Sequence, residues 1–198
     1  MIEHEPWCGP LYREPGVDGQ HIAIVGYSHH HDGVDYDGLT IDVLRRWTDG
    51  ERFANSLFPY VESYFDGIVQ QDLWNRVLFF NYLPDCIGTG EERFNSGSKQ
   101  QVERAKSRFL DIIAKHKPHK VLVFTKRGWS TFPETREEEA HTGLRRLEPK
   151  ELYDFTWGTY DANGSIIGAF GLRHPQFANG QLMRQAVQCI LAMPVLGG

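Results

Sequence analysis

Four short apolar runs constrain the fold of this chain most strongly. They are rich in β-branched or aromatic residues and lie at positions 21–26, 77–80, 121–124 and 166–170. Short continuous apolar runs of this composition are typical of strands that are covered on both faces. Glycines weaken the signal of the fourth run, since glycine contributes no side chain to pack. The runs therefore predict a sheet of four buried strands.

Helical patterns separate these runs. Apolar residues between 41 and 47 follow at helical spacing, and the aromatic stretch 58–69 is compatible with a helix. The clearest amphipathic pattern covers 100–115, and residues 181–193 again look helical. Alternating strands and helices predict an α/β fold, a three-layer sandwich around a central, mostly parallel four-stranded sheet.

Length, charge and cysteine content narrow the class of protein further. The 198 residues and 40% hydrophobic content suit a single domain over 1–198. A net charge of −5 excludes a protein that coats nucleic acid through a wholly basic surface. No apolar run approaches the roughly 20 residues that span a bilayer, and residues 1–5 do not resemble a signal peptide. We expect a cytoplasmic monomer without a membrane partner.

Three loops should meet at one edge of the predicted sheet. Parallel strands bind ligands beyond their carboxyl ends, which places segments 26–33, 81–90 and 171–180 together. The first segment is unusually polar for a structural turn, with candidate catalytic side chains Ser28, His29, His30 and Asp32. It has three interpretations: a catalytic loop that orients water, a metal site, and a solvated loop.

The metal interpretation lacks a ligand pattern. Adjacent histidines point apart, so a metal in the first loop would need help from Asp32, His141 or His174, none of which stands at a recognisable spacing. Cys8, Cys86 and Cys189 are far apart and odd in number. We therefore expect no metal, no other cofactor and no disulfide framework.

Three further residues are candidates for recognition and catalysis. Asn81 ends the second run, and its amide offers the acceptor and donors that complement a pyrimidine edge, although a turn or cap is the simpler interpretation. His174 follows the fourth run, where a histidine before proline is more often structural, and Phe177 follows in a polar loop. Proteins that extract a base from DNA insert an apolar side chain into the stack, which gives Phe177 a possible role as a wedge.

The ordered set of motifs resembles the uracil-DNA glycosylase superfamily over about residues 20 to 190. The motifs are Ile24-Val25-Gly26-Tyr27-Ser28-His29-His30, Phe79-Phe80-Asn81-Tyr82-Leu83-Pro84, Val121-Leu122-Val123-Phe124 followed by Gly128-Trp129, and His174-Pro175-Gln176. The resemblance implies a DNA repair hydrolase that flips a deaminated base, such as uracil, and cleaves its N-glycosidic bond. By position, Asn81 would read the base in a site shared with Gly26, Tyr27 and Phe80. His174 would donate toward the negative charge that develops on the uracil oxygen.

This chain departs from the family at two positions. Ser28 stands where the water-activating aspartate is often found, so His29, His30 or Asp32 would have to replace it, or cleavage would depend mainly on stabilising the leaving base. Gln176 replaces the serine of the His-Pro-Ser loop. The four-cysteine cluster of some branches is also absent. These departures indicate a divergent member.

The charge distribution suggests where DNA would bind. Segment 99–127 holds nine Lys or Arg against two acidic residues, whereas residues 1–75 hold four arginines against thirteen acids. Such an asymmetry can give one face a field that attracts phosphate, although a solvated helix would look the same. Lys126 and Arg127, after the third run, are the predicted DNA contacts near the site, together with Arg173, Gln176 and Phe177.

Two other functions fit parts of the same pattern. Gly26-Tyr27-Ser28 resembles the nucleophile turn of a GDSL-like serine esterase with His174 as base, but position 171, where a partner aspartate would stand, is glycine. A non-catalytic nucleic-acid binder on the glycosylase fold would also explain the missing aspartate.

Overall fold

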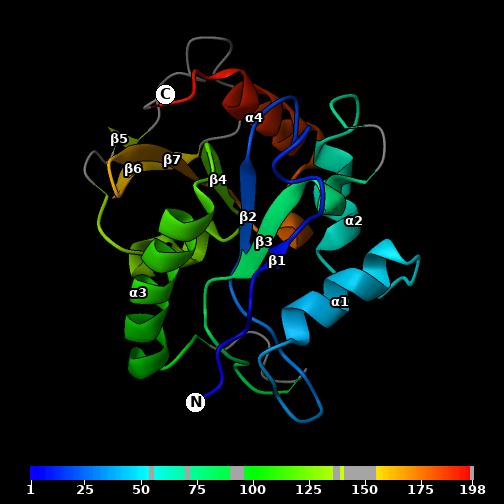
Figure 1. The fold of residues 1–198 in the computed structure, drawn as a ribbon, viewed down its shortest axis with the longest axis vertical. Coiled ribbons are helices and arrows are strands. Elements are labelled where there is room, and N and C mark those ends of the chain that lie inside the picture. The colour runs from blue at the N-terminus through cyan, green and yellow to red at the C-terminus, as the bar shows by residue number, and fades with distance from the viewer. Residues whose placement is uncertain (54–55, 70–71, 90–95, 136–138, 141–154, 197–198) are drawn as a thin grey trace.

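A mixed β-sheet forms the centre of the protein. The structure is a computed structural model that describes residues 1–53, 56–69, 72–89, 96–135, 139–140 and 155–196. Its strands follow the order β1-β3-β2-β4-β7-β6-β5 across the sheet (Figure 1). Their bounds are β1 Trp7–Cys8, β2 Ile22–Gly26, β3 Val77–Asn81, β4 Lys120–Val123, β5 Glu139–Ala140, β6 Thr156–Ala162 and β7 Ser165–Gly171.

The four predicted strands are β3, β2, β4 and β7, and they pair in parallel at the centre of the sheet. The prediction of a four-stranded sheet was nevertheless wrong, because antiparallel strands extend both sides. β1 pairs with β3, while β6 pairs with β7 and β5 with β6. The β6–β7 hairpin closes through Asn163 and Gly164, whose φ angles of 55° and 86° suit a tight two-residue turn.

Helices cover both faces of the sheet. Their bounds are α1 Leu39–Thr48, α2 Phe58–Tyr64, α3 Lys99–His116 and α4 Gly180–Ala192. Each predicted helix is present, but α2 ends at Tyr64 and not at residue 69 as the aromatic stretch suggested. In Figure 1, α3 lies on one side of the sheet and α1 and α2 on the other, which gives three layers.

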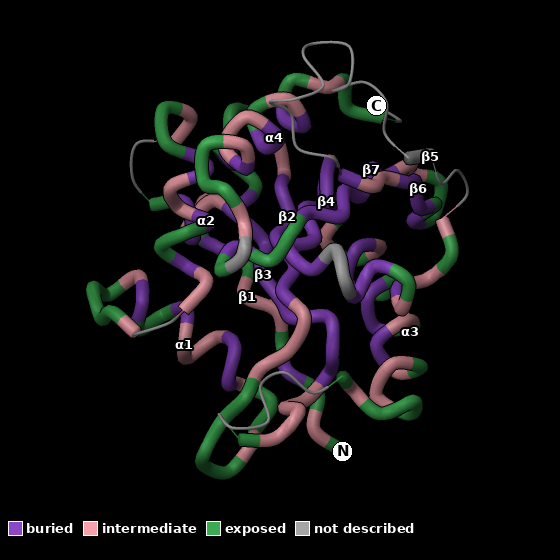
Figure 2. Tube along the Cα trace, turned by 180° about the vertical axis from the view of Figure 1, so that it is seen from behind, coloured by how far each residue is buried: buried purple, intermediate pink, exposed green. Residues whose placement is uncertain are grey.

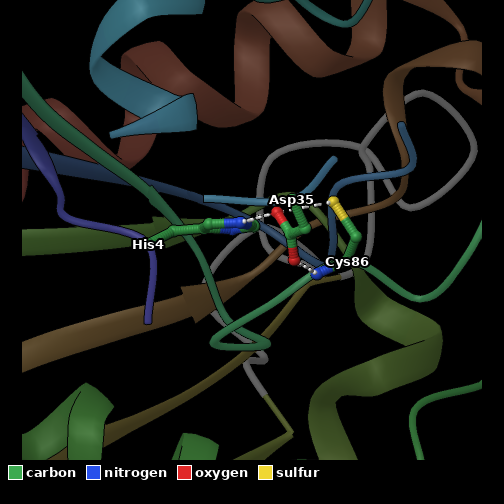
Figure 3. A group of neighbouring side chains, drawn as sticks. All are labelled: His4, Asp35 and Cys86. Atoms are coloured by element: carbon green, nitrogen blue, oxygen red, sulfur yellow. Dashed lines mark hydrogen bonds and ion pairs between the residues drawn. The ribbon is translucent and has the colours of Figure 1, made fainter. Parts of the chain in front are cut away.

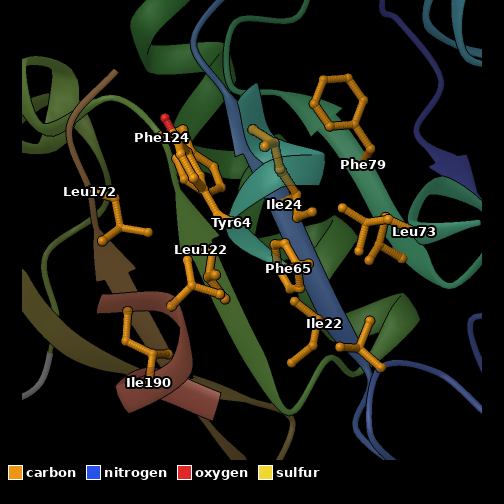
Figure 4. Close-up of a cluster of buried hydrophobic side chains, with 14 of the residues drawn as sticks. Ile22, Ile24, Tyr64, Phe65, Leu73, Phe79, Leu122, Phe124, Leu172 and Ile190 are labelled. Carbon is orange, nitrogen blue, oxygen red and sulfur yellow. The ribbon is translucent and has the colours of Figure 1, made fainter. Parts of the chain in front are cut away.

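Alternation along the strands creates two cores. Ile22, Ile24 and Phe79 point toward the layer of α1, α2 and α4, as Figure 4 shows. Their neighbours Ala23 and Phe80 pack with α3 on the opposite face. The central strands are therefore buried along their length (Figure 2). No helix in the described part of the chain is long and apolar enough to cross a membrane.

The parallel strands place the predicted loops together at the end of the sheet where the carboxyl ends of the strands lie. This end of the sheet is called the carboxyl edge below. The first two loops are joined by backbone hydrogen bonds. Tyr82 N donates to Gly26 O at 3.0 Å, Ile87 N donates to His29 O at 3.0 Å, and His31 N donates to Gly88 O at 3.1 Å. The third loop continues beside β4, since Leu172 N donates to Val123 O at 2.7 Å.

Candidate functional site

The side chain of Asn81 lies over the backbone of Gly26 at the carboxyl edge. The two residues are paired in register where β2 and β3 end. A Cβ on Gly26 would lie 2.1 Å from Asn81 Oδ1, so only glycine leaves room for this amide. Asn81 is only 3% exposed, and its Oδ1 has no hydrogen-bond partner in the described protein. Buried amide oxygens are normally paired, which makes this atom the strongest candidate for ligand recognition.

Helix α2 crosses this edge on the same face as the Asn81 side chain. At its start, Leu57 Cδ2 would lie 3.9 Å from a Cβ on Gly26, and at its end the ring of Tyr64 lies 6.0 Å from that of Phe124. The oxygen of Tyr64 points past Phe124 toward the carboxyl edge in Figure 4. Within the described residues, Tyr64 Oη and Ser56 Oγ are buried without a hydrogen-bond partner. These two atoms are further buried polar groups on the side of the sheet that α2 covers.

Tyr27 occupies the space between the loops after β3 and β4. Its ring stacks on that of Tyr82, with centroids 6.3 Å apart. A Cβ on Gly128 would lie 2.9 Å from the Tyr27 ring, so the aromatic face rests directly on this part of the backbone. Tyr27 is half-buried and packs against the cluster of Phe80 and Phe109 on the α3 side of the sheet, so its contact with a base beside Asn81 stays a prediction.

Phe80 does not line this site. It is fully buried among the residues that pack against α3, with its ring 6.1 Å from that of Phe109. The Arg108 guanidinium lies over the same ring at 5.7 Å. Because side chains alternate along a strand, Phe80 and Asn81 must face opposite sides of the sheet. The prediction that both contact one base was therefore wrong for Phe80.

His29 is held by the protein and is poorly suited to acid–base chemistry. Its Nε2 lies 2.8 Å from Thr40 Oγ1, and its ring meets that of His4 edge-on at 5.0 Å. Burial, reinforced by nearby His4, lowers the pKa of His29 to about 3. A neutral imidazole with so low a pKa is a weak base at neutral pH. We conclude that His29 anchors the first loop to the start of α1.

The other candidates of the first loop point to the outside. His30 and Asp32 are exposed, and Ser28 is half-buried directly after Tyr27. The loop therefore has two half-buried residues, Ser28 and the anchoring His29, and an exposed polar tip.

His174 begins the third loop as the cap of a short 3-10 helix, η5 Pro175–Phe177. Its Nδ1 accepts a hydrogen bond from Gln176 N at 3.3 Å, which places the proton of a neutral ring on Nε2. His174 as a whole is exposed, but its imidazole ring is partly desolvated by neighbouring groups, which lowers the pKa of the ring below its usual value. Arg173 and Gln176 are also exposed, and the side chain of Phe177 lies outside the described residues.

The basic segment does not form a single face. Arg108 is buried and donates to the carbonyl oxygens of Asn81 and His4. Lys120 is also buried, and its Nζ donates to Leu191 O at 2.8 Å, at the opposite edge of the sheet. Burial lowers the pKa of Lys120 to about 8. Two of the nine basic residues of segment 99–127 therefore cannot contribute to an exposed basic face, because charges counted along a helix and a strand point in different directions.

The remaining predicted DNA contacts follow β4. Lys126 and Arg127 begin the 3-10 helix η3 Lys126–Thr131, which lies at the carboxyl edge. Their side chains are outside the described part of the structure. The backbone of both residues therefore lies after β4 at the carboxyl edge, as predicted.

No family model and no curated protein matches this chain. Its function therefore has to be inferred from the chemistry of the carboxyl edge.

Proposed function

We propose that the protein is a DNA glycosylase that binds an extruded deaminated base, with uracil as the first candidate, and hydrolyses its N-glycosidic bond. The observation that carries this proposal is the buried Asn81 amide over Gly26, whose Oδ1 has no partner in the described chain. Uracil presents an N–H between two carbonyl oxygens, which complements an amide oxygen and amide N–H side by side. Cytosine presents a lone pair and an amino group there, so the same amide orientation disfavours it.

The position of His174 supports a role in stabilising the leaving base. β3 and β7 are separated by β2 and β4, which puts their ends about 14 Å apart at 4.7–4.9 Å per strand. A pyrimidine with one hydrogen bond on each side fits between two side chains that reach inward from these strands. His174 Nε2–H would donate to the base oxygen as negative charge develops, which is where a fixed donor accelerates cleavage most.

Water activation is weaker than in a site with an aspartate. Ser28 cannot act as a base at neutral pH, and the low pKa of His29 makes it a poor substitute. Asp32 and His30 are the exposed candidates for orienting water. We propose that stabilisation of the departing base supplies most of the rate, since an oxocarbenium-like transition state needs only modest help from water.

Neither the strand order nor Asn81 supports the esterase alternative. Ser28 follows β2 and His174 follows β7, with β4 between them, so their strands are about 10 Å apart. A nucleophilic serine and its base need to approach within hydrogen-bond distance. The unpartnered Asn81 oxygen also has no role in that mechanism.

An oligonucleotide panel tests the proposal. Single- and double-stranded oligonucleotides that carry uracil, hypoxanthine or xanthine would be incubated with the protein, and abasic sites would be cleaved with alkali. We expect abasic product, with activity reduced at least about 100-fold in Asn81→Ala, since the base loses its only buried amide contact. Asn75→Ala, in the 3-10 helix η1 Leu73–Asn75 that precedes β3, is the matched control and should retain activity.

Two results would contradict this function. Absence of abasic product from every substrate would exclude a glycosylase that acts on these bases. Tight binding to damaged DNA without turnover would favour the non-catalytic binder.

A further inference from the structure

Three side chains with metal-binding chemistry meet beside the carboxyl edge. They come from segments far apart in the sequence: His4 from the N-terminal segment, Asp35 from the loop between β2 and α1, and Cys86 from the loop after β3 (Figure 3). His4 is fully buried, whereas Asp35 and Cys86 are partly exposed. None belongs to the predicted glycosylase residues.

The donor atoms of these side chains already lie close together. His4 Nε2 is 2.6 Å from Asp35 Oδ1, and Cys86 Sγ is 3.3 Å from the same oxygen. One ligand atom from each residue lies within 4.8 Å of the others. Bonds of about 2.0–2.3 Å to a tetrahedral zinc ion leave neighbouring donor atoms about 3–4 Å apart, so small side-chain shifts would admit an ion.

Backbone groups and Arg108 hold these segments in place. His4 N donates to Pro84 O at 2.7 Å, and the Arg108 guanidinium donates to the carbonyl oxygen of His4. Cys86 N donates to Asp35 Oδ2 at 3.0 Å. The positive charge of Arg108 is partly offset by Glu3, whose carboxylate oxygen is 3.9 Å from the arginine Nε. The three donors are thus fixed before any ion binds.

Charge and proton balance favour a divalent cation. In the cation-free protein the Cys86 thiol hydrogen-bonds the Asp35 carboxylate. Binding would replace the thiol proton by the metal and release one proton to solvent. Thiolate and carboxylate then carry two negative charges against the two positive charges of the ion. His4 Nδ1 has no hydrogen-bond partner among the described residues, and it would carry the ring proton when Nε2 binds the ion.

We propose that the protein binds one zinc ion, or a similar borderline-soft divalent cation, through His4 Nε2, the Asp35 carboxylate and the Cys86 thiolate, with water as the fourth ligand. Mixed nitrogen, sulfur and oxygen donors are the set that zinc accepts, whereas magnesium and calcium prefer oxygen alone. The ion would fasten the N-terminal segment to the first two loops. This inference does not depend on the proposed glycosylase function.

Cobalt spectroscopy and metal analysis test the site. Protein purified with zinc should retain about one ion per chain, and Co²⁺ should produce a thiolate-to-cobalt charge-transfer band. Cys86→Ser should abolish the band and weaken zinc binding by more than about 100-fold, because even partners that only orient a ligand cost 10- to 100-fold. Cys189→Ser, a half-buried cysteine of α4, is the matched control and should change neither.

Two further variants keep the test decisive. Asp35→Asn preserves the shape of the carboxylate and should fold, as judged by circular dichroism, but should lose zinc and the zinc-dependent rise in unfolding temperature. His30→Gln with His31→Gln removes two exposed histidines that can bind metal adventitiously, and should leave the cobalt band intact. A folded wild-type protein without metal or cobalt band would overturn the proposal. A band that survives Cys86→Ser would overturn it equally.

Discussion

Replacing Gly26 by alanine should force the Asn81 amide out of its position. The added Cβ would lie 2.1 Å from Asn81 Oδ1, about 1.4 Å inside the ~3.5 Å of an optimal non-bonded contact. Asn81 is buried on all sides and cannot move away cheaply. Overpacking of this kind costs 1–3 kcal/mol, so we expect a loss of about 2 kcal/mol in the free energy of unfolding. For a chain of this length, this lowers the unfolding temperature by about 4–8 °C.

The destabilisation caused by Gly26→Ala should disappear when the Asn81 amide is already absent. In an Asn81→Ala background, the next side chain facing the new methyl group is Leu57, at an ordinary contact distance of 3.9 Å. A double-mutant cycle measured by urea denaturation should therefore show a coupling energy of about 2 kcal/mol. Equal destabilisation by Gly26→Ala in both backgrounds would refute the contact, and so would no destabilisation in the wild type.

Two other variants test the site at the level of single groups. His174→Ala should slow cleavage by about 100- to 1000-fold with little change in the affinity for uracil-containing DNA, because the lost donor acts only as charge develops. Single-turnover rates measure the cleavage and binding isotherms measure the affinity. An equal loss in both would argue against the leaving-group role. The pKa of His29 is lowered to about 3 in the folded protein, against about 6.5 in the unfolded chain. Between these two pH values the unfolded state therefore binds more protons than the folded state, so the free energy of unfolding should fall as the pH drops through this interval. His29→Gln should flatten this dependence in denaturation series, and an unchanged slope would show that another group is responsible.

Local patterns predicted most of the fold. The four parallel strands and four helices each carry a contiguous signal, and all are present close to the expected residues. Strand β6 was missed because its apolar residues are mixed with Thr, Gly and Asp. The Asn163-Gly164 pair, a strong hairpin signal between β6 and β7, would have revealed it.

The site was only partly predictable because its members meet through tertiary contacts. Asn81 and Gly26 stand out at the ends of strands, and the structure brings them into contact. Nothing in the spacing of Ser56 and Tyr64 indicates that both side chains have buried polar atoms without a partner among the described residues. His4, Asp35 and Cys86 likewise have no motif spacing, since three separate segments have to fold together before their side chains meet.

The hydrogen bonds between the first two loops restrict how this edge can be altered. Residues 26–31 and 82–88 run beside each other and share backbone bonds at both ends. An insertion in one loop would break the register of the other, so new specificity is more accessible by side-chain exchange than by changes in loop length. The same pairing predicts that their amides exchange with solvent as one cooperative unit. Grafting either loop onto a related scaffold would require transferring both.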